Sequence, residues 1–195
     1  MKYILSLVTV TIFFFSLQAQ DSFSTTNSKV EMNGTSTLHD WKANITKSSG
    51  SGKFTINNGS LTAIHSLDLT MEASTIKSEK GSGMDNNIYK ALKTKQHPNI
   101  TFSLTKVNSL VKKGNSYDID AVGKLTVAGT TKTVNLKATG QESGGNIVVK
   151  GSTMLKMTDF NVEPPVLFLG TMKTGDDVTI NFETTLSKST GLSNK

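Results

Sequence analysis

The 195-residue sequence contains no cysteine, only three prolines and three histidines, and a single tryptophan. Without cysteine the chain can form neither disulfides nor thiolate metal sites, and thiol catalysis is excluded. His39, His65 and His97 are widely spaced and form no HxH or HExxH motif, so we expect no metal site. No glycine-rich phosphate loop follows a strand and opens a helix, so we expect no nucleotide or other cofactor.

The chain also lacks a compact block of basic residues. Its formal net charge is +6, from 21 Lys and Arg against 15 Asp and Glu, and the lysines are scattered through the sequence. This scatter indicates a solubilising surface and speaks against nucleic acid as a partner. Weak attraction to an anionic membrane surface stays open as an interpretation of the same charge.

Long apolar runs are confined to the N-terminus. After Met1 and Lys2, residues 4–17 carry no charge, and Ala19 offers a small residue for cleavage. The run is shorter than the roughly 20 residues of a membrane span. It therefore predicts a cleaved signal peptide over 1–19 and a periplasmic or secreted protein, with a retained anchor as the alternative. We expect one domain over 20–187 and a flexible, polar tail over 188–195.

Most of the remaining sequence alternates apolar and polar residues. In "VTINFETTL", Val178, Ile180 and Phe182 share one face of an extended chain, and "NITFSL", "YDIDAVGKLTV" and "TKTVNLKATG" repeat the pattern. A period of two is typical of half-buried antiparallel strands. The segments "KKGNS", "VAGTT", "ESGGN", "NNGS" and "KTGDD" predict hairpin turns between them. "MNGT" predicts either a turn or a glycine kink within a strand.

One segment, "SGMDNNIYKALKTKQHPNI", places apolar residues at four-residue spacing. It predicts a short helix over about residues 85–94, capped by Asp85 and ending before Pro98. Strands with one helix and no βαβ alternation predict an all-β sandwich or barrel. Long strands with glycine interruptions favour an extended antiparallel β-barrel of about eight strands with one inserted helix.

The stretch "TSTLHDW" places the single tryptophan beside a histidine and an aspartate. If it is a strand, His39 and Trp41 share the face that lines the barrel lumen, and Asp40 lies on the other. His39 and Asp40 then cannot form the His–Asp pair of a catalytic triad, and no GxSxG motif occurs. We therefore expect no catalytic residue and no enzyme activity; a hydrolase that uses His39 or Asp159 is the less favoured alternative.

A barrel of about eight strands has a lumen that side chains fill or that holds one small ligand. An apolar lumen would bury a hydrocarbon chain with a gain of about 25 cal/mol per Å² and without a charged anchor. His39 and Asp159 are the candidate polar contacts. A fully packed core without a cavity is the alternative. The candidate lumen residues are Trp41, Ile100, Phe102, Leu104, Leu125, Val127, Phe160, Phe168, Ile180 and Phe182.

Four segments resemble, in the same order, those of the YceI-like family. "MDNNIYKALKTKQHPNITFSLTKV" is similar to the family's helix and its Tyr/His-Pro-x-Ile-x-Phe strand, and "GKLTVAGTTKTVNL" to its Gly-x-Leu-Thr-x-x-Gly-x-Thr-x-x-Val hairpin. "MTDFNVEPP…TGDDVTINFE" resembles the Asp-Phe loop with the closing Gly-Asp-x-Val strand. "TSTLHDW" resembles the Ser-x-x-His region in the His-Asp-Trp form of one branch. Together the segments cover nearly all of the mature chain.

The resemblance implies a lipocalin-like barrel open at one end in an exported bacterial protein. It also implies a long-chain isoprenoid or fatty-acyl ligand, carried or sequestered in the lumen, with no catalysis; homodimers are common in the family. The alternative is a structural or stress-associated interaction module with a filled barrel. One position departs from the family, which often has Arg shortly before the Asp-Phe pair. Here "LKMTDF" offers Lys156 and Thr158, and Lys lacks the fork geometry of Arg.

Overall fold

The computed structural model describes residues 20–167 and 170–189. The predicted signal peptide at 1–19, Phe168, and residues 190–195 of the predicted tail therefore lie outside the described residues. Most of the described chain is strand, with one α-helix, α1 (Ser82–Ala91), and two short 3-10 helices, η1 (Ala73–Thr75) and η2 (Thr158–Phe160). The strands are β1 (Asp21–Ser36), β2 (Trp41–Ile45), β3 (Ser48–Asn57), β4 (Ser60–Glu72), β5 (Ile76–Ser78), β6 (Asn99–Lys113), β7 (Ser116–Val127), β8 (Thr130–Ser143), β9 (Asn146–Lys156), β10 (Val166–Leu167) and β11 (Met172–Lys188).

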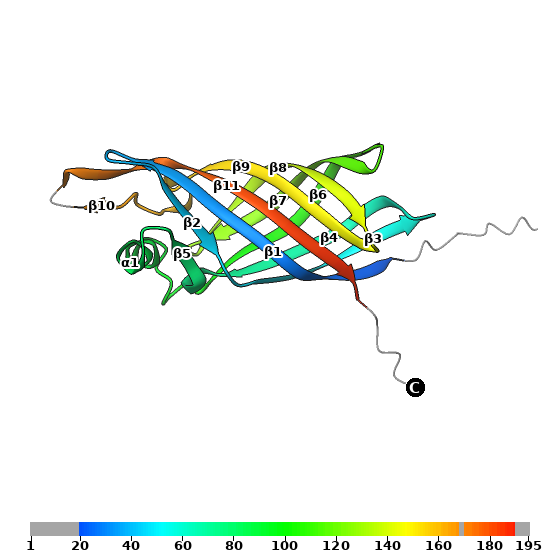
Figure 1. Ribbon diagram of the computed structural model, residues 1–195, viewed down its shortest axis with the longest axis horizontal. Helices are drawn as coiled ribbons and strands as arrows, with labels where there is room; N and C mark the ends of the chain where they lie inside the picture. The colour runs from blue at the N-terminus through cyan, green and yellow to red at the C-terminus, as the bar shows by residue number, and fades with distance from the viewer. Residues whose placement is uncertain (1–19, 168–169, 190–195) are drawn as a thin grey trace, which may run out of the picture.

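Eight of these strands form a closed antiparallel barrel in the order β1, β3, β4, β6, β7, β8, β9 and β11. Pairing of β11 with β1 closes the ring, and β2, β5 and β10 extend it outside the closure. This confirms the predicted all-β barrel of about eight strands with one inserted helix. Figure 1 shows an elongated barrel with α1, β5 and β10 at one end, which we call the helix end. The opposite end, where the described chain starts and stops, is called the closed end.

Glycine-containing hairpin turns connect the long strands as the sequence predicts. The two central residues of three turns have positive φ: Asn58 and Gly59, Ala128 and Gly129, and Gly144 and Gly145. Such paired positive φ angles match the twist of the flanking strands. "MNGT" is a glycine position within β1 rather than a turn, because Gly34 pairs with both Val178 and Trp41.

The turn predicted at "KTGDD" is wrong, because β11 runs through it without interruption. Thr174 pairs with Ser36 of β1, and Asp177 pairs with Lys156 of β9, so hydrogen-bonded neighbours hold this segment extended. Gly175 lies so close to Thr35 that a side chain at this position would collide with it. The glycine thus permits close approach of two strands. β11 also includes Lys188, where the sequence predicts the start of the tail.

The helix lies three residues earlier than predicted, and Asp85 does not cap it. Gly81 occupies the cap position of α1, and Asp85 lies inside its first turn with only 5 % of its surface exposed. Its carboxylate accepts hydrogen bonds from Ser78 N at 2.7 Å and from Lys77 Nζ at 3.1 Å. Tyr89 Oη donates to Ile76 O at 2.7 Å. These bonds fasten α1 to β5 across the helix end of the barrel.

The stretch "TSTLHDW" is not a strand, so the predicted face shared by His39 and Trp41 is wrong. β1 ends at Ser36, β2 begins at Trp41, and His39 lies in the exposed turn between them. Ser36 Oγ donates to His39 O at 2.7 Å, which stabilises the turn. Thr37 N donates to Lys173 O at 3.0 Å, which fastens the turn to β11. Only Trp41 of this group faces the barrel interior.

We expect Asp85→Ala to lower the free energy of unfolding by about 1–3 kcal/mol, because it leaves the Ser78 N–H without its acceptor. The hydrogen bond from Ser78, followed by Lys77, holds the pKa of the Asp85 carboxyl below its usual value. The stabilisation is therefore complete above the ordinary Asp pKa of about 3.9 and is lost as pH falls through the lowered pKa. Urea denaturation at neutral pH and in acid should show the difference from wild type shrinking in acid, and Asp85→Asn, which keeps an acceptor, should lose less. An equal loss at both pH values would contradict this account.

Candidate functional site

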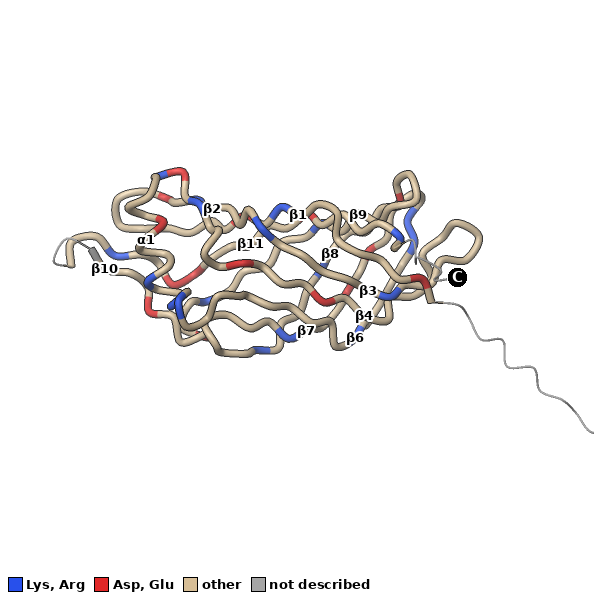
Figure 2. Tube along the Cα trace, turned by 90° about the horizontal axis from the view of Figure 1, so that it is seen from below, with Lys and Arg blue, Asp and Glu red and all other residues tan. Residues whose placement is uncertain are grey.

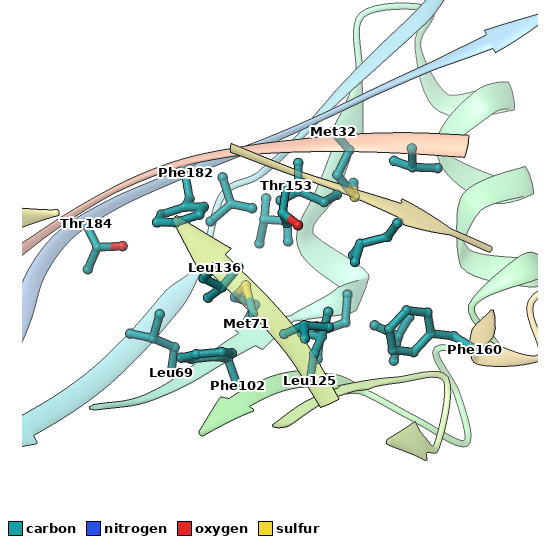
Figure 3. Close-up of a pocket in the computed structure, with 18 of the residues that line it drawn as sticks. Met32, Leu69, Met71, Phe102, Leu125, Leu136, Thr153, Phe160, Phe182 and Thr184 are labelled. Atoms are coloured by element: carbon teal, nitrogen blue, oxygen red, sulfur yellow. The ribbon is translucent and has the colours of Figure 1, made fainter. Parts of the chain in front are cut away.

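Inward-facing side chains of the barrel enclose a cavity of about 250 Å³. This lies just below the range of roughly 300–1,000 Å³ that is usual for ligand pockets. The lining is almost wholly apolar and draws on β1, β2, β3, β4, β6, β7, β8, β9, β11 and α1. The barrel is therefore hollow in part, which differs from the alternative of a core filled throughout. Figure 3 shows Phe160 and Thr184 at opposite ends of the lined space, with Met71, Leu136 and Phe102 between them.

The sequence-predicted lumen residues come together on this lining. Their strands present alternate side chains inward, because successive residues of a strand point to opposite faces. Phe168 lies outside the described residues. Contact of these residues with a ligand stays a prediction. The cavity is lined by Trp41, Ile100, Phe102, Leu104, Leu125, Val127, Phe160, Ile180 and Phe182.

The two candidate polar contacts do not reach the cavity. His39 is exposed in the turn between β1 and β2, and its Nδ1 lies 3.1 Å from Asp40 O, so the contact is with backbone. Asp159 is exposed in η2. Neither belongs to the lining, and contact of either residue with a ligand stays a prediction.

Four methionines line the cavity, and the sequence reasoning did not select them. Met32, Met71, Met84 and Met157 come from β1, β4, α1 and the residue before η2. Met71 lies in the alternating stretch "SLDLTME", so the same period of two could have identified it. Methionine is unbranched and polarizable, and it adapts to irregular shapes. Part of the lining is therefore flexible and can change its shape.

Aromatic rings lie flat against glycines on the inner wall. A Cβ atom added to Gly34 would lie 2.5 Å from Trp41 Cε2, and one added to Gly151 would lie 2.5 Å from Phe182 Cζ. Gly151 is the direct cross-strand partner of Phe182. Trp41 Nε1 also donates to Thr35 O at 3.2 Å, which fixes the plane of its ring. The rings therefore occupy the wall, and the lumen between them stays open.

The few polar members of the lining are spread along the cavity, from Thr184 toward the closed end to Asn87 and Thr174 at the helix end. Lys156 of β9 also belongs to the lining. Lys156 Nζ donates to Asp177 Oδ1 at 3.0 Å, and this hydrogen bond raises the pKa of Lys156. Lys156 follows the outward-facing Met154 by two residues, so its ammonium group faces the outside of the barrel, and the cavity itself is lined almost wholly by apolar groups.

A metal site, a membrane-spanning helix and a charged binding surface each require a particular grouping of side chains among the described residues. Within residues 20–167 and 170–189, no group of three or more His, Asp or Glu is placed to hold a metal ion. In the same ranges, no helix combines the length and apolar character needed to cross a bilayer. Figure 2 shows basic and acidic residues interspersed along the barrel, in line with the scattered charge of the sequence.

We expect Gly34→Ala to lower the free energy of unfolding by about 1–3 kcal/mol, because the new methyl group overpacks against the Trp41 ring. In a Trp41→Leu background the same substitution should cost clearly less, since the ring is gone. Urea denaturation of the two single variants and the double variant measures this coupling. Gly83→Ala is the control: no atom lies within 4 Å of the added Cβ in α1, so stability should hold or rise. Additive losses would contradict the ring contact as the cause.

Comparison with known proteins agrees with this architecture. A polyisoprenoid-binding domain from Saccharophagus degradans, implicated in plant cell wall breakdown, has a TM-score of 0.67 at 13% identity, covering 88% of this chain and 99% of that one. BcnA of Burkholderia cenocepacia has a TM-score of 0.63 at 22% identity, covering 81% of this chain and 95% of that one. The YceI protein of Campylobacter jejuni has a TM-score of 0.60 at 20% identity, with 75% and 85% covered.

At these identities the solved structures show a shared fold and no more. No curated protein matches the sequence. The model of the YceI-like domain matches residues 19–186, which is nearly the whole barrel and most of the chain. The barrel, the inserted helix and this match together place the chain in the YceI-like domain family.

Proposed function

We propose that this protein binds lipid and holds the hydrocarbon part of a long-chain isoprenoid or fatty-acyl amphiphile in its barrel, for sequestration or transport. The observation that carries the proposal is the apolar cavity of about 250 Å³. Burial of hydrocarbon against such a lining gains about 25 cal/mol per Å². The related domain from Saccharophagus degradans is described as polyisoprenoid-binding, which supports the same ligand class. The cavity also favours this function over a structural module with a filled barrel.

The ligand would lie along the barrel with its polar group at the helix end. At that end the lining includes the half-buried polar side chains of Asn87 and Thr174. The deeper lining is almost wholly apolar and would leave a polar head group without hydrogen-bond partners, at a cost of several kcal/mol. Lys156, close to the position where the family often has Arg, pairs with Asp177 on the outer face of the barrel.

Several further properties belong to the same proposal. The protein would be non-catalytic, since the lining carries neither His39 nor Asp159. The apolar residues 4–17 support export and a periplasmic or secreted location. Contact with a membrane surface would give access to amphiphiles, and the net charge of +6 supports contact with anionic lipid. Homodimer formation is proposed from the family resemblance.

The proposal is tested with delipidated protein and a polyprenol or a long-chain fatty acid. Trp41 is the single tryptophan and lines the cavity, so its emission reports occupancy. Leu125→Asp should weaken binding at least about tenfold, because it introduces a charge into the apolar lumen.

Met154→Asp is the matched control, since Met154 on β9 points outward and is 68% exposed. It should bind as wild type does. Mass spectrometry of an organic extract should also find lipid bound to the purified protein. Wild-type protein that carries no lipid and takes up none would contradict the proposed function.

A further inference from the structure

On three strands of the wall, β7, β9 and β11, the lining of the cavity stops before the closed end. On these strands the last lining residues toward the closed end are Ile119 of β7, Val149 of β9 and Thr184 of β11. Phe54 of β3 and Ile64 of β4 line the cavity where it meets the buried cluster at the closed end. In Figure 3 Thr184 marks this end of the lined space. The next inward-facing residues on the same strands, which the cavity does not reach, are Tyr117, Ile147 and Leu186.

These three residues form a dense layer. They are 2%, 2% and 0% exposed, in the order in which they occur in the chain, and they pack with Phe23 and Leu61. Tyr117 Oη donates to Glu142 Oε1 at 2.8 Å and accepts a hydrogen bond from Leu61 N at 3.0 Å. The ring of Tyr117 therefore cannot swing aside without breaking both bonds. This layer, which we call the floor, would therefore block a hydrocarbon chain that reaches it.

We propose that Tyr117, Ile147 and Leu186 set the longest hydrocarbon chain that the barrel can bury, which makes them determinants of ligand specificity. This inference rests on the proposed lipid-binding function. From Val127 to Ile119 on β7 the lining spans about 26 Å of strand, or roughly 20 Å along the barrel axis at a typical tilt. Each methylene added within that depth tightens binding about fourfold. Methylenes beyond it find no apolar wall, so the gain stops.

A series of straight-chain fatty acids from octanoic to docosanoic acid tests the floor. Wild-type affinity should rise with chain length and then level off. Ala138 lines the cavity beside Ile119, its cross-strand partner on β7. Ala138→Leu should therefore shorten the chain length at which affinity levels off and weaken binding of the longest acids about tenfold. Ala91→Leu makes the same substitution on the lining at the helix end and should leave that length unchanged. Ala121→Leu repeats the test if circular dichroism shows that Ala138→Leu is misfolded.

The outcomes separate the floor from the function itself. The proposed limit on chain length is contradicted if Ala138→Leu or Ala121→Leu leaves the length at which affinity levels off unchanged. It is also contradicted if wild-type affinity rises with every added methylene. Neither result contradicts lipid binding. Wild-type protein that binds no acid of any length, and no polyprenol either, overturns the proposed function and the floor with it.

A second inference comes from an independent feature, a split in the barrel wall. β8 and β9 pair from Ala138 to Ser143 and from Asn146 to Gly151. Toward the helix end, residues 130–137 and 152–156 of these described strands have no ladder to each other. η2 contacts both strands there, and Phe160 and Val162, 4% and 3% exposed, line the cavity. We call residues 157–162 the wedge.

The wedge is attached mainly to β11. Met157 N donates to Asp176 O at 2.9 Å, and Thr158 donates to the Asp176 carboxylate from N at 2.9 Å and from Oγ1 at 2.7 Å. Its bond to β8 runs from Asn161 Nδ2 to Thr130 Oγ1 at 3.1 Å, between exposed groups. On the other side of the opening, α1 is fastened by Asp85 and Tyr89 to β5. By hydrogen bonds the wedge is held to β8 less firmly than α1 is held to β5, and its movement must also separate Phe160 and Val162 from their apolar contact with Val134 of β8.

We infer that ligand enters and leaves sideways, between β8 and β9, when the wedge swings out on its β11 attachment. This inference again rests on the proposed function. Asn161→Gly retains the positive φ of 55° at this position and removes the bond to β8. Thr130→Val removes the same bond from the other partner. Each should speed release of a bound fluorescent fatty acid about fivefold in stopped-flow displacement, with the equilibrium affinity little changed.

Tyr89→Phe is the matched control, because it removes one hydrogen bond that holds α1 and leaves the wedge intact. Its release rate should equal that of wild type. If Tyr89→Phe speeds release and the two wedge variants do not, ligand leaves past α1 and the lateral route is overturned. Unchanged release in all three variants overturns it as well. Both results are compatible with lipid binding, so the proposed function is judged separately.

Discussion

The close contact between aromatic rings and glycines on the inner wall allows this barrel to be closed and hollow at the same time. An eight-stranded barrel has an interior just wide enough for its side chains to fill it or for one small ligand. Large rings that crossed the lumen would leave no space for a ligand. Gly34 and Gly151 instead let Trp41 and Phe182 lie flat against the strands, where they bury apolar surface without entering the lumen. The cavity, and any function that needs it, depends on this arrangement.

The barrel divides into two halves with different packing. In the closed half, buried residues such as Tyr117 and Leu186 fill the interior, and Phe23 meets Phe54 edge to face at 5.0 Å. In the half toward α1, methionines and aliphatic side chains surround open space. Apolar burial in the closed half stabilises the fold and offsets the stability that is lost because the other half contains a cavity. The half that would meet the ligand can then remain adaptable, because the fold does not rely on it for all of its stability.

Local patterns in the sequence were sufficient for the barrel and for the inward face of strands such as β7, because the period of two reports burial directly. Features that depend on distant partners were not predictable. The turn at His39 is stabilised by a hydrogen bond from Thr37 to Lys173, which lies far away in the sequence. "KTGDD" is extended because β1 and β9 pair with it on its two sides. Asp85 looked like a helix cap, yet its acceptor capacity is used by Ser78. Whether the lumen is hollow follows from which side chains oppose each other across it, and no single strand carries that information.

The split between β8 and β9 also has a consequence for the behaviour of the protein at high concentration. Unpaired strand edges are templates on which another chain can add, and proteins protect them by covering them or by placing lysine there. The wedge covers the gap with Phe160, and Lys132, Lys137 and Lys156 lie on the two strands that border it. The wedge thus guards against edge-to-edge aggregation, and the ligand exchange proposed for it would place a second demand on the same few residues.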